Sequence, residues 1–154
     1  MDIKFERVLD QIGLKILHEL QMNARISFSE VGRRVGLSSP AVAERVKKME
    51  EAGIICGYHV KVDYEKIGFP ILAFVFLTTQ SEKYKKLYTF AEDTLEIAEC
   101  HCISGSESFI LRVLTSSISK LDDLVEKLSA FGETKTSIVL SSPIKKIVIG
   151  WGHN

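Results

Sequence analysis

Apolar residues near the start of the chain recur at intervals of three and four, which is the period of an amphipathic helix. Asp10 stands directly before this row and is a candidate N-cap, because a short carboxylate can accept a free backbone N–H. The pattern therefore predicts a helix that starts after Asp10. Its apolar row consists of Ile12, Ile16, Leu17 and Leu20.

Two shorter helices are predicted between residues 27 and 55. Ser27 and Glu30 have the spacing of a capping box, and Gly36 can end that helix in the left-handed conformation. The next helix closes at Gly53, and its predicted buried positions are Val42, Val46 and Met49. Three helices with such a short turn indicate a helix-turn-helix core.

The outward positions of the third predicted helix favour an interaction with DNA. Small side chains let a helix approach base edges, and cations contact phosphates. A generic helical hairpin with solvated charges would share the apolar pattern, but the short turn and the local cations favour DNA. We predict groove contacts from Ser38, Ser39, Pro40, Ala43, Glu44, Lys47 and Lys48, and phosphate contacts from Arg25, Arg33 and Arg34.

The charge of the chain is balanced overall, with 20 basic and 20 acidic residues. A DNA-binding protein needs a basic patch rather than a basic total. Residues 25–48 hold six basic and two acidic side chains, so the local excess is modest. Arg45 is ambiguous, because it could pair with Glu19 or Glu50 instead of touching DNA. We expect modest affinity per subunit and dependence on an assembly with several DNA-binding sites.

The pattern after residue 70 changes to alternating strands and helices. Gly105 to Glu107 form a predicted turn between two strands. Strands are expected at 71–79, 97–104, 108–115 and 136–140, and helices at 82–93 and from a cap at Ser119. This order is that of a ferredoxin-like βαββαβ sandwich, so the fold class is α+β.

The segment between the two patterns resembles a linker. Tyr58, Val60 and Val62 alternate with polar residues, which indicates a strand or hairpin. We expect a winged-helix-like helix-turn-helix domain over 1–55, a linker strand or hairpin over 56–69, and a ferredoxin-like effector-binding and oligomerisation domain over 70–154. A further apolar strand is expected at 144–149.

The first strand of the second half is apolar on both faces. Leu72, Phe74 and Phe76 point to one face, and apolar residues also fill the alternate positions. Two helices can cover only one face of a four-stranded sheet. A partner subunit is the simplest cover for the second face, so we predict a homodimer through this sheet. Two recognition helices related by a two-fold axis would read a palindromic DNA site.

The composition argues for a cytoplasmic protein; with the predicted DNA binding we expect it to be nucleoid-associated, and we expect no cofactor. The longest apolar run, 70–77, is too short to span a bilayer, and the first residues lack an apolar signal-peptide core. An odd number of cysteines, three, argues against a disulfide framework. Cys100 and Cys102 share one face of a predicted strand and His101 lies opposite, so no metal site is expected.

Several stretches, in their order and spacing, resemble the Lrp/AsnC (leucine-responsive, feast/famine) transcriptional regulators over nearly the whole chain. They are Leu9-Asp10 with Ile16-Leu17, Asn23-Ala24-Arg25, Val35-Gly36-Leu37-Ser38, Arg45-Val46 with Glu50, Gly53-Ile54-Ile55, Gly68, Gly105, Leu111-Arg112-Val113 and residues 134–140. The resemblance implies DNA binding by the helix-turn-helix and an amino-acid-sensing sandwich. It also implies dimers that assemble further, often into octamers.

The resemblance also implies an effector site at the turn and the closing strand, formed by Gly105, Ser106, Glu107, Ser108, Thr134 and Thr136. Family members that sense amino acids often carry Asp where this chain has Ser108, and serine cannot offer a charge to an ammonium group. The ligand could therefore differ or be absent. Alternatives are an effector-independent DNA-wrapping protein and an enzyme like the sirohaem decarboxylases that share this fold.

Overall fold

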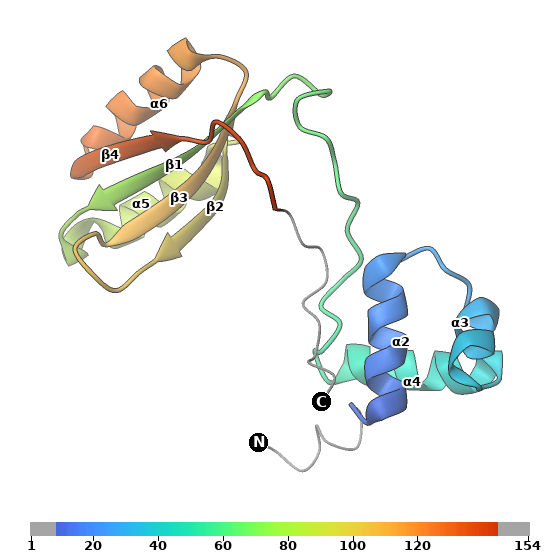
Figure 1. Cartoon of the computed structure of the whole chain (residues 1–154). Coiled ribbons are helices and arrows are strands. Elements are labelled where there is room, and N and C mark those ends of the chain that lie inside the picture. Colours follow the sequence, from blue (N-terminus) through green and yellow to red (C-terminus); the bar gives the residue numbers. More distant parts are fainter. Residues whose placement is uncertain (1–8, 145–154) are drawn as a thin grey trace. The chain divides into compact units, whose positions relative to one another are not determined.

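The computed structural model describes residues 9–144. The chain divides into two compact units between Lys61 and Val62, and the second unit ends at Pro143 (Figure 1). The first unit contains helices and the second contains the sheet. Each unit has a hydrophobic core of its own, and each is described separately below.

The helical unit contains α2 (Gln11–Met22), α3 (Phe28–Val35) and α4 (Ser39–Glu51). Asp10 caps α2 by accepting the Gly13 N–H at 2.7 Å, and Ser27 caps α3 by accepting the Glu30 N–H at 3.2 Å. Gly36 ends α3 with φ of 75°. The predicted helices and these three signals are therefore confirmed. Buried residues from all three helices form the core: Ile16, Leu20, Val31, Val42, Val46 and Met49.

Gly32 allows α3 to pack closely against the turn that follows it. A Cβ at this position would collide with the carbonyl oxygen of Leu37. The Leu37 N–H also donates to the Gly32 carbonyl oxygen at 2.9 Å. A backbone oxygen cannot rotate away as a side chain can, so the turn requires glycine at this position.

The strand expected over 58–62 is not formed, and this part of the linker prediction is wrong. Residues 56–63 have no regular secondary structure, and turns follow at 64–68. Val60 is 87% exposed, so the alternating pattern has no neighbouring strand to pair with in the described chain. Tyr58 is held locally instead, because its hydroxyl donates to Glu50 at 2.8 Å.

The second unit is a four-stranded antiparallel sheet with the order β2-β3-β1-β4. This order is that of the ferredoxin-like fold, as predicted. Its elements are β1 (Ile71–Thr78), a 3₁₀ turn η1 (Ser81–Lys83), α5 (Tyr84–Asp93), β2 (Ile97–Cys102), β3 (Phe109–Thr115), α6 (Ile118–Ser129) and β4 (Glu133–Ile138).

Several element boundaries differ from the prediction, and two of them are informative. Ser117, not Ser119, caps α6 by accepting the Lys120 N–H at 3.2 Å. Both residues are serines, so the sequence could not show at which of them the helix begins. The last strand starts at Glu133 rather than at residue 136, because its backbone pairs with β1 before its side chains become apolar. The strand expected at 144–149 lies outside the described residues, apart from Ile144, which is not in a strand.

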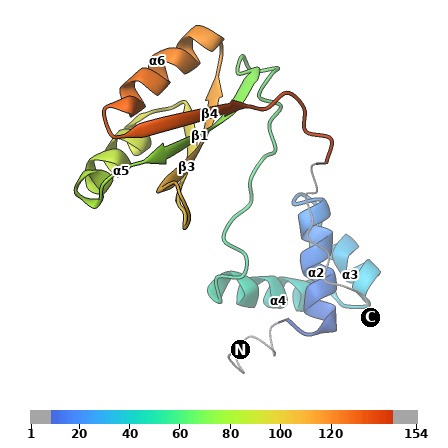
Figure 2. The ribbon, with the colours of Figure 1, turned by 60° about the vertical axis from the view of Figure 1, so that its left-hand side comes forward.

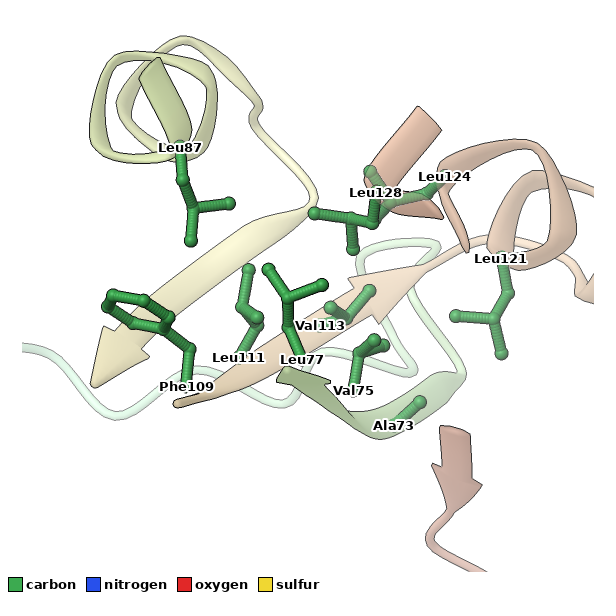
Figure 3. Close-up of a cluster of buried hydrophobic side chains, with 10 residues drawn as sticks. All are labelled: Ala73, Val75, Leu77, Leu87, Phe109, Leu111, Val113, Leu121, Leu124 and Leu128. Atoms are coloured by element: carbon green, nitrogen blue, oxygen red, sulfur yellow. The ribbon is translucent and has the colours of Figure 1, made fainter. Parts of the chain in front are cut away.

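Both helices of this unit pack on the same face of the sheet (Figure 2). Leu87 of α5 and the leucines of α6 point onto the inward residues of β1 and β3 (Figure 3). The cluster consists of Ala73, Val75, Leu77, Leu87, Phe109, Leu111, Val113, Leu121, Leu124 and Leu128. The described helices of this unit leave the other face open. Leu72, Phe74 and Phe76 stand on that open face and are half-buried.

The predicted faces of β2 are also confirmed. Cys100 and Cys102 lie opposite Leu111 and Phe109 on the helix side, whereas His101 lies opposite Ile110 on the open face.

No described helix is long and apolar enough to cross a membrane.

Candidate DNA-binding surface and effector region

Helix α4 is buried along one side and exposed along the other. Val42, Val46 and Met49 are buried in the helical core. The predicted groove contacts all lie away from that core: Ser38, Ser39, Pro40, Glu44, Lys47 and Lys48 are exposed, and Ala43 is half-exposed. A helix held by one side with small and charged residues on the other has the form needed for a groove.

The cations of this exposed side are only weakly engaged. Lys47 lies 3.6 Å from Glu51 and Lys48 lies 3.2 Å from Glu44, each one turn away on the same helix. All four side chains are more than half exposed. Solvated pairs of this kind contribute little, so either lysine can exchange its partner for a phosphate.

The arginines of α3 are more strongly engaged. Arg33 donates to Glu30 at 2.6 and 2.9 Å, and Arg34 donates to Glu30 at 2.9 Å and to Glu19 at 2.6 Å. Hydrogen bonds from both arginines lower the pKa of Glu30 to about 2. Glu19 lies outside residues 25–48, so the sequence count of charges did not include it. Together, Glu30 and Glu19 offset most of the positive charge that Arg33 and Arg34 bring to α3.

Arg45 has an acidic partner, as one alternative anticipated, but the partner is neither Glu19 nor Glu50. Its Nη1 and Nη2 donate to the two carboxylate oxygens of Asp10 at 2.8 and 3.0 Å. Sequence reasoning missed Asp10 because the two residues are 35 positions apart. The hydrogen bond from Arg45, followed by that from the Gly13 N–H, lowers the pKa of Asp10.

Arg25 lies outside these networks, in the turn between α2 and α3. Its backbone N–H donates to Asn23 Oδ1 at 3.0 Å, and the residue is exposed. This local bond fixes the turn without using the guanidinium group. Arg25 is therefore available to a phosphate.

The predicted effector residues gather only in part. Ser108 and Thr134 both adjoin Leu77, from opposite sides of β1: the Ser108 N–H donates to the Leu77 carbonyl oxygen at 2.9 Å, and Thr134 pairs with Leu77 in the β1–β4 register. Thr136 lies further along β4, opposite Val75. Five of the six residues therefore lie at or next to one end of the sheet, the end at which β1 finishes, and Thr136 lies apart.

The turn before β3 is polar and exposed. Gly105 has φ of 134°, which favours glycine, and the Ser106 hydroxyl donates to Glu107 at 2.6 Å. Ser108 differs from its neighbours because its hydroxyl is already engaged. It donates to the Thr79 carbonyl oxygen at 3.1 Å and accepts the Thr79 N–H at 3.2 Å. Thr79 was not singled out by sequence reasoning, since nothing in the pattern indicates which backbone a serine will bind.

Two family models match this chain. The AsnC-type helix-turn-helix domain matches residues 9–50, and the Lrp/AsnC ligand binding domain matches residues 72–149. The chain belongs to the Lrp/AsnC family.

Individual relatives cover most of the chain. The HTH-type transcriptional regulator YezC of Bacillus subtilis is 40% identical over 134 residues, which are 87% of this chain and 95% of YezC. The leucine-responsive regulatory protein of Haemophilus influenzae is 31% identical over 147 residues, covering 91% and 89% of the two chains. The solved structure of Bacillus subtilis LrpC matches with a TM-score of 0.85 at 33% identity, covering 90% of this chain and 99% of LrpC.

These matches confirm the predicted family, the fold class and the main functional prediction. This Lrp/AsnC protein is a helix-turn-helix transcriptional regulator, and its second unit is a domain of the Lrp/AsnC ligand-binding type.

Proposed function

We propose that this Lrp/AsnC regulator reads DNA with the exposed side of α4. The observation that carries the proposal is the division of α4 into a buried row and an outward row that includes Lys47 and Lys48. Arg25 would contact phosphates beside it, while Arg33 and Arg34 would first have to loosen their bonds to Glu30. Base edges would be approached at the small residues Ser39 and Ala43.

The regulator would act as a homodimer formed through the open face of the sheet. Leu72, Phe74 and Phe76 on that face are only half-covered within one chain, and such apolar residues favour a partner surface. A two-fold dimer would present two copies of α4 to a palindromic site. Assembly of dimers into octamers, implied by the family resemblance, would extend contact over several sites.

Amino-acid sensing at the turn before β3 would have to work without a carboxylate at position 108. The Ser108 hydroxyl makes both of its bonds to Thr79, so it supports the fold rather than a ligand's ammonium group. This observation favours a second candidate: regulation through DNA wrapping without an amino-acid effector.

The test begins with selection of duplexes from a random pool by the full chain, followed by footprinting and light scattering. We expect a symmetric selected sequence bound by dimers or larger assemblies. Enrichment of no sequence, together with lone subunits at micromolar concentration, would contradict the proposal. Thermal-shift screening against the standard amino acids then separates the two candidates, because a ligand that prefers the native state raises the melting temperature.

We also propose that the protein acts as a regulator and not as an enzyme. Adding a tetrapyrrole to the purified chain tests the alternative of a sirohaem-decarboxylase-like activity. We expect no change in the tetrapyrrole's absorption spectrum, and conversion of the tetrapyrrole would overturn this part of the proposal.

A further inference from the structure

The start of α2 and the flank of α4 are joined by a bidentate ion pair. Asp10 Oδ1 accepts the Gly13 N–H at 2.7 Å and the Arg45 Nη1 donor at 2.8 Å, while Oδ2 accepts the Arg45 Nη2 donor at 3.0 Å. One carboxylate therefore caps α2 and holds a side chain of α4. The fork of the guanidinium group fixes both distance and angle between its partners.

This pair differs from the other described ion pairs of α4. Lys47 and Lys48 pair with residues on their own helix, which leaves the placement of that helix unaffected. The buried side chains of Val42, Val46 and Met49 pack α4 against the core, but as apolar groups they make no hydrogen bond to α2. Among the described contacts, the bond from Arg45 to Asp10 is the directional link between α4 and α2.

We infer that Arg45 is a positioning residue, which sets the orientation of α4 for sequence reading through its bidentate bond to Asp10. This inference rests on the proposed function, since it assumes that α4 reads DNA. Arg45 lies between the buried row and the outward row and is less exposed than Lys47, with side-chain exposures of 30% and 68%. Its two terminal nitrogens face Asp10 rather than solvent on the outward side.

A positioning role for Arg45 and a direct phosphate contact by Arg45 predict different effects on DNA binding. A direct phosphate contact would raise affinity for all sequences and would add to the salt dependence of binding. A positioning residue would change the preference for the correct sequence and would leave the salt dependence unchanged. A small displacement of α4 is enough, because one good base contact discriminates about 5- to 150-fold between the correct and the wrong base.

The experiment uses two disruptive single variants of the full chain, their combination, one conservative variant and one control. Asp10→Ser keeps an N-cap hydroxyl for Gly13 but withdraws both carboxylate oxygens from Arg45. Arg45→Met keeps the length of the stem without the guanidinium group. Arg45→Lys is the conservative variant, since it keeps the positive charge but lacks the planar guanidinium group that makes the bidentate bond. Lys15→Met, on an exposed position of α2, is the matched control.

Affinities are measured by fluorescence anisotropy at several salt concentrations. The probes are a duplex that the wild-type chain selects from a random pool and a scrambled duplex of equal length. We expect Asp10→Ser and Arg45→Met each to lower the ratio of the two affinities about tenfold, the cost of about one displaced base contact, with the salt slope unchanged. The double variant should lose no more than either single variant. Arg45→Lys should recover part of the ratio.

A lower salt slope in Arg45→Met, or additive losses in the double variant, would overturn the inference in favour of a direct phosphate contact. An unchanged affinity ratio in Asp10→Ser and Arg45→Met would also overturn it, and a lowered melting temperature in those variants would then show that the pair acts on stability alone. A wild-type chain without preference for any duplex would instead overturn the proposed sequence reading, and with it the role assigned to Arg45.

Discussion

Ser108 and Thr79 are bonded to each other twice, across the end of the β1–β3 pair. The Ser108 hydroxyl donates to the Thr79 carbonyl oxygen at 3.1 Å and accepts the Thr79 N–H at 3.2 Å. Thr79 is bonded in turn to the end of α6, because its own hydroxyl donates to the Phe131 carbonyl oxygen at 2.6 Å. A position expected to serve an effector thus serves the fold, by tying β3, β1 and the α6–β4 turn together.

Ser108→Ala should therefore destabilise the sheet unit. The substitution leaves the half-buried N–H and carbonyl of Thr79 without their partner, which costs about 1–3 kcal/mol in the free energy of unfolding. Urea denaturation of the full chain, followed by circular dichroism, measures the loss. Ser106→Ala is the control, because within residues 9–144 the Ser106 hydroxyl bonds to the neighbouring Glu107 alone. Equal stability of the two variants would contradict the structural role of Ser108.

Lys47→Ala should weaken binding to every duplex and lower the slope of log affinity against log salt by about one, the signature of one lost phosphate contact. The reason is that Lys47 is exposed on α4, and its one ion pair among the described residues is a long contact of 3.6 Å to Glu51. Lys120→Ala, an exposed position at the start of α6, is the control and should keep the wild-type slope. A salt titration by anisotropy that gave the same slope for both variants would remove Lys47 from the proposed interface.

The stability of the helical unit should fall in acid through Glu30. Its pKa is lowered from 4.5 to about 2 by Arg33 and Arg34, so its contribution is complete above pH 4.5. That contribution is lost as the pH falls from 4.5 towards 2, because the unfolded state takes up the proton first. Melting temperatures followed by circular dichroism across this range measure the effect.

Glu30→Gln should melt below the wild type near neutral pH and approach it at the acid end of that range. Glu51→Gln is the control, because Glu51 has a single described partner at 3.6 Å. A melting-temperature difference between Glu30→Gln and wild type that did not change with pH would show that the arginine bonds are unimportant in solution.

Gly32→Ala should destabilise the helical unit by about 1–3 kcal/mol, which is the range for overpacking. The added Cβ would meet the Leu37 carbonyl oxygen, so α3 and the following turn would have to separate. Ser29→Ala lies on an exposed position of the same helix and should be neutral or slightly stabilising, because alanine is the better helix former. Thermal unfolding of both variants makes the comparison, and an undiminished melting temperature for Gly32→Ala would contradict the close packing.

Phe74→Lys should dissociate the proposed dimer. Phe74 lies on the open face of the sheet between Arg112 of β3 and Ser137 of β4, so a lysine there would place a charge within the partner contact. Sedimentation or light scattering should report single subunits, and DNA affinity should fall because paired sites are lost. Thr89→Lys on the exposed side of α5 adds the same group elsewhere and should leave the assembly intact.

The sequence alone determined the positions of several helices and of the first strand, because these depend on neighbouring residues. The caps at Asp10 and Ser27 and the stop at Gly36 act within one turn of the residues that display them, so their helices could be predicted from the sequence. The continuous apolar run from Ile71 likewise predicted a strand with two apolar faces. The order of strands and helices was enough for the ferredoxin-like fold and, with the motif spacing, for the family.

Partners distant in the sequence were decided by the three-dimensional path of the chain. Arg45 reaches Asp10 across 35 positions, Arg34 reaches Glu19 across 15, and Ser108 reaches Thr79 across 29. The chemical type of a side chain shows which hydrogen bonds it can make. The packing of the buried residues decides which partner lies close enough to make them. The same limit explains the missing strand at 58–62, because alternation shows that a segment can pair and only a neighbouring strand allows it to do so.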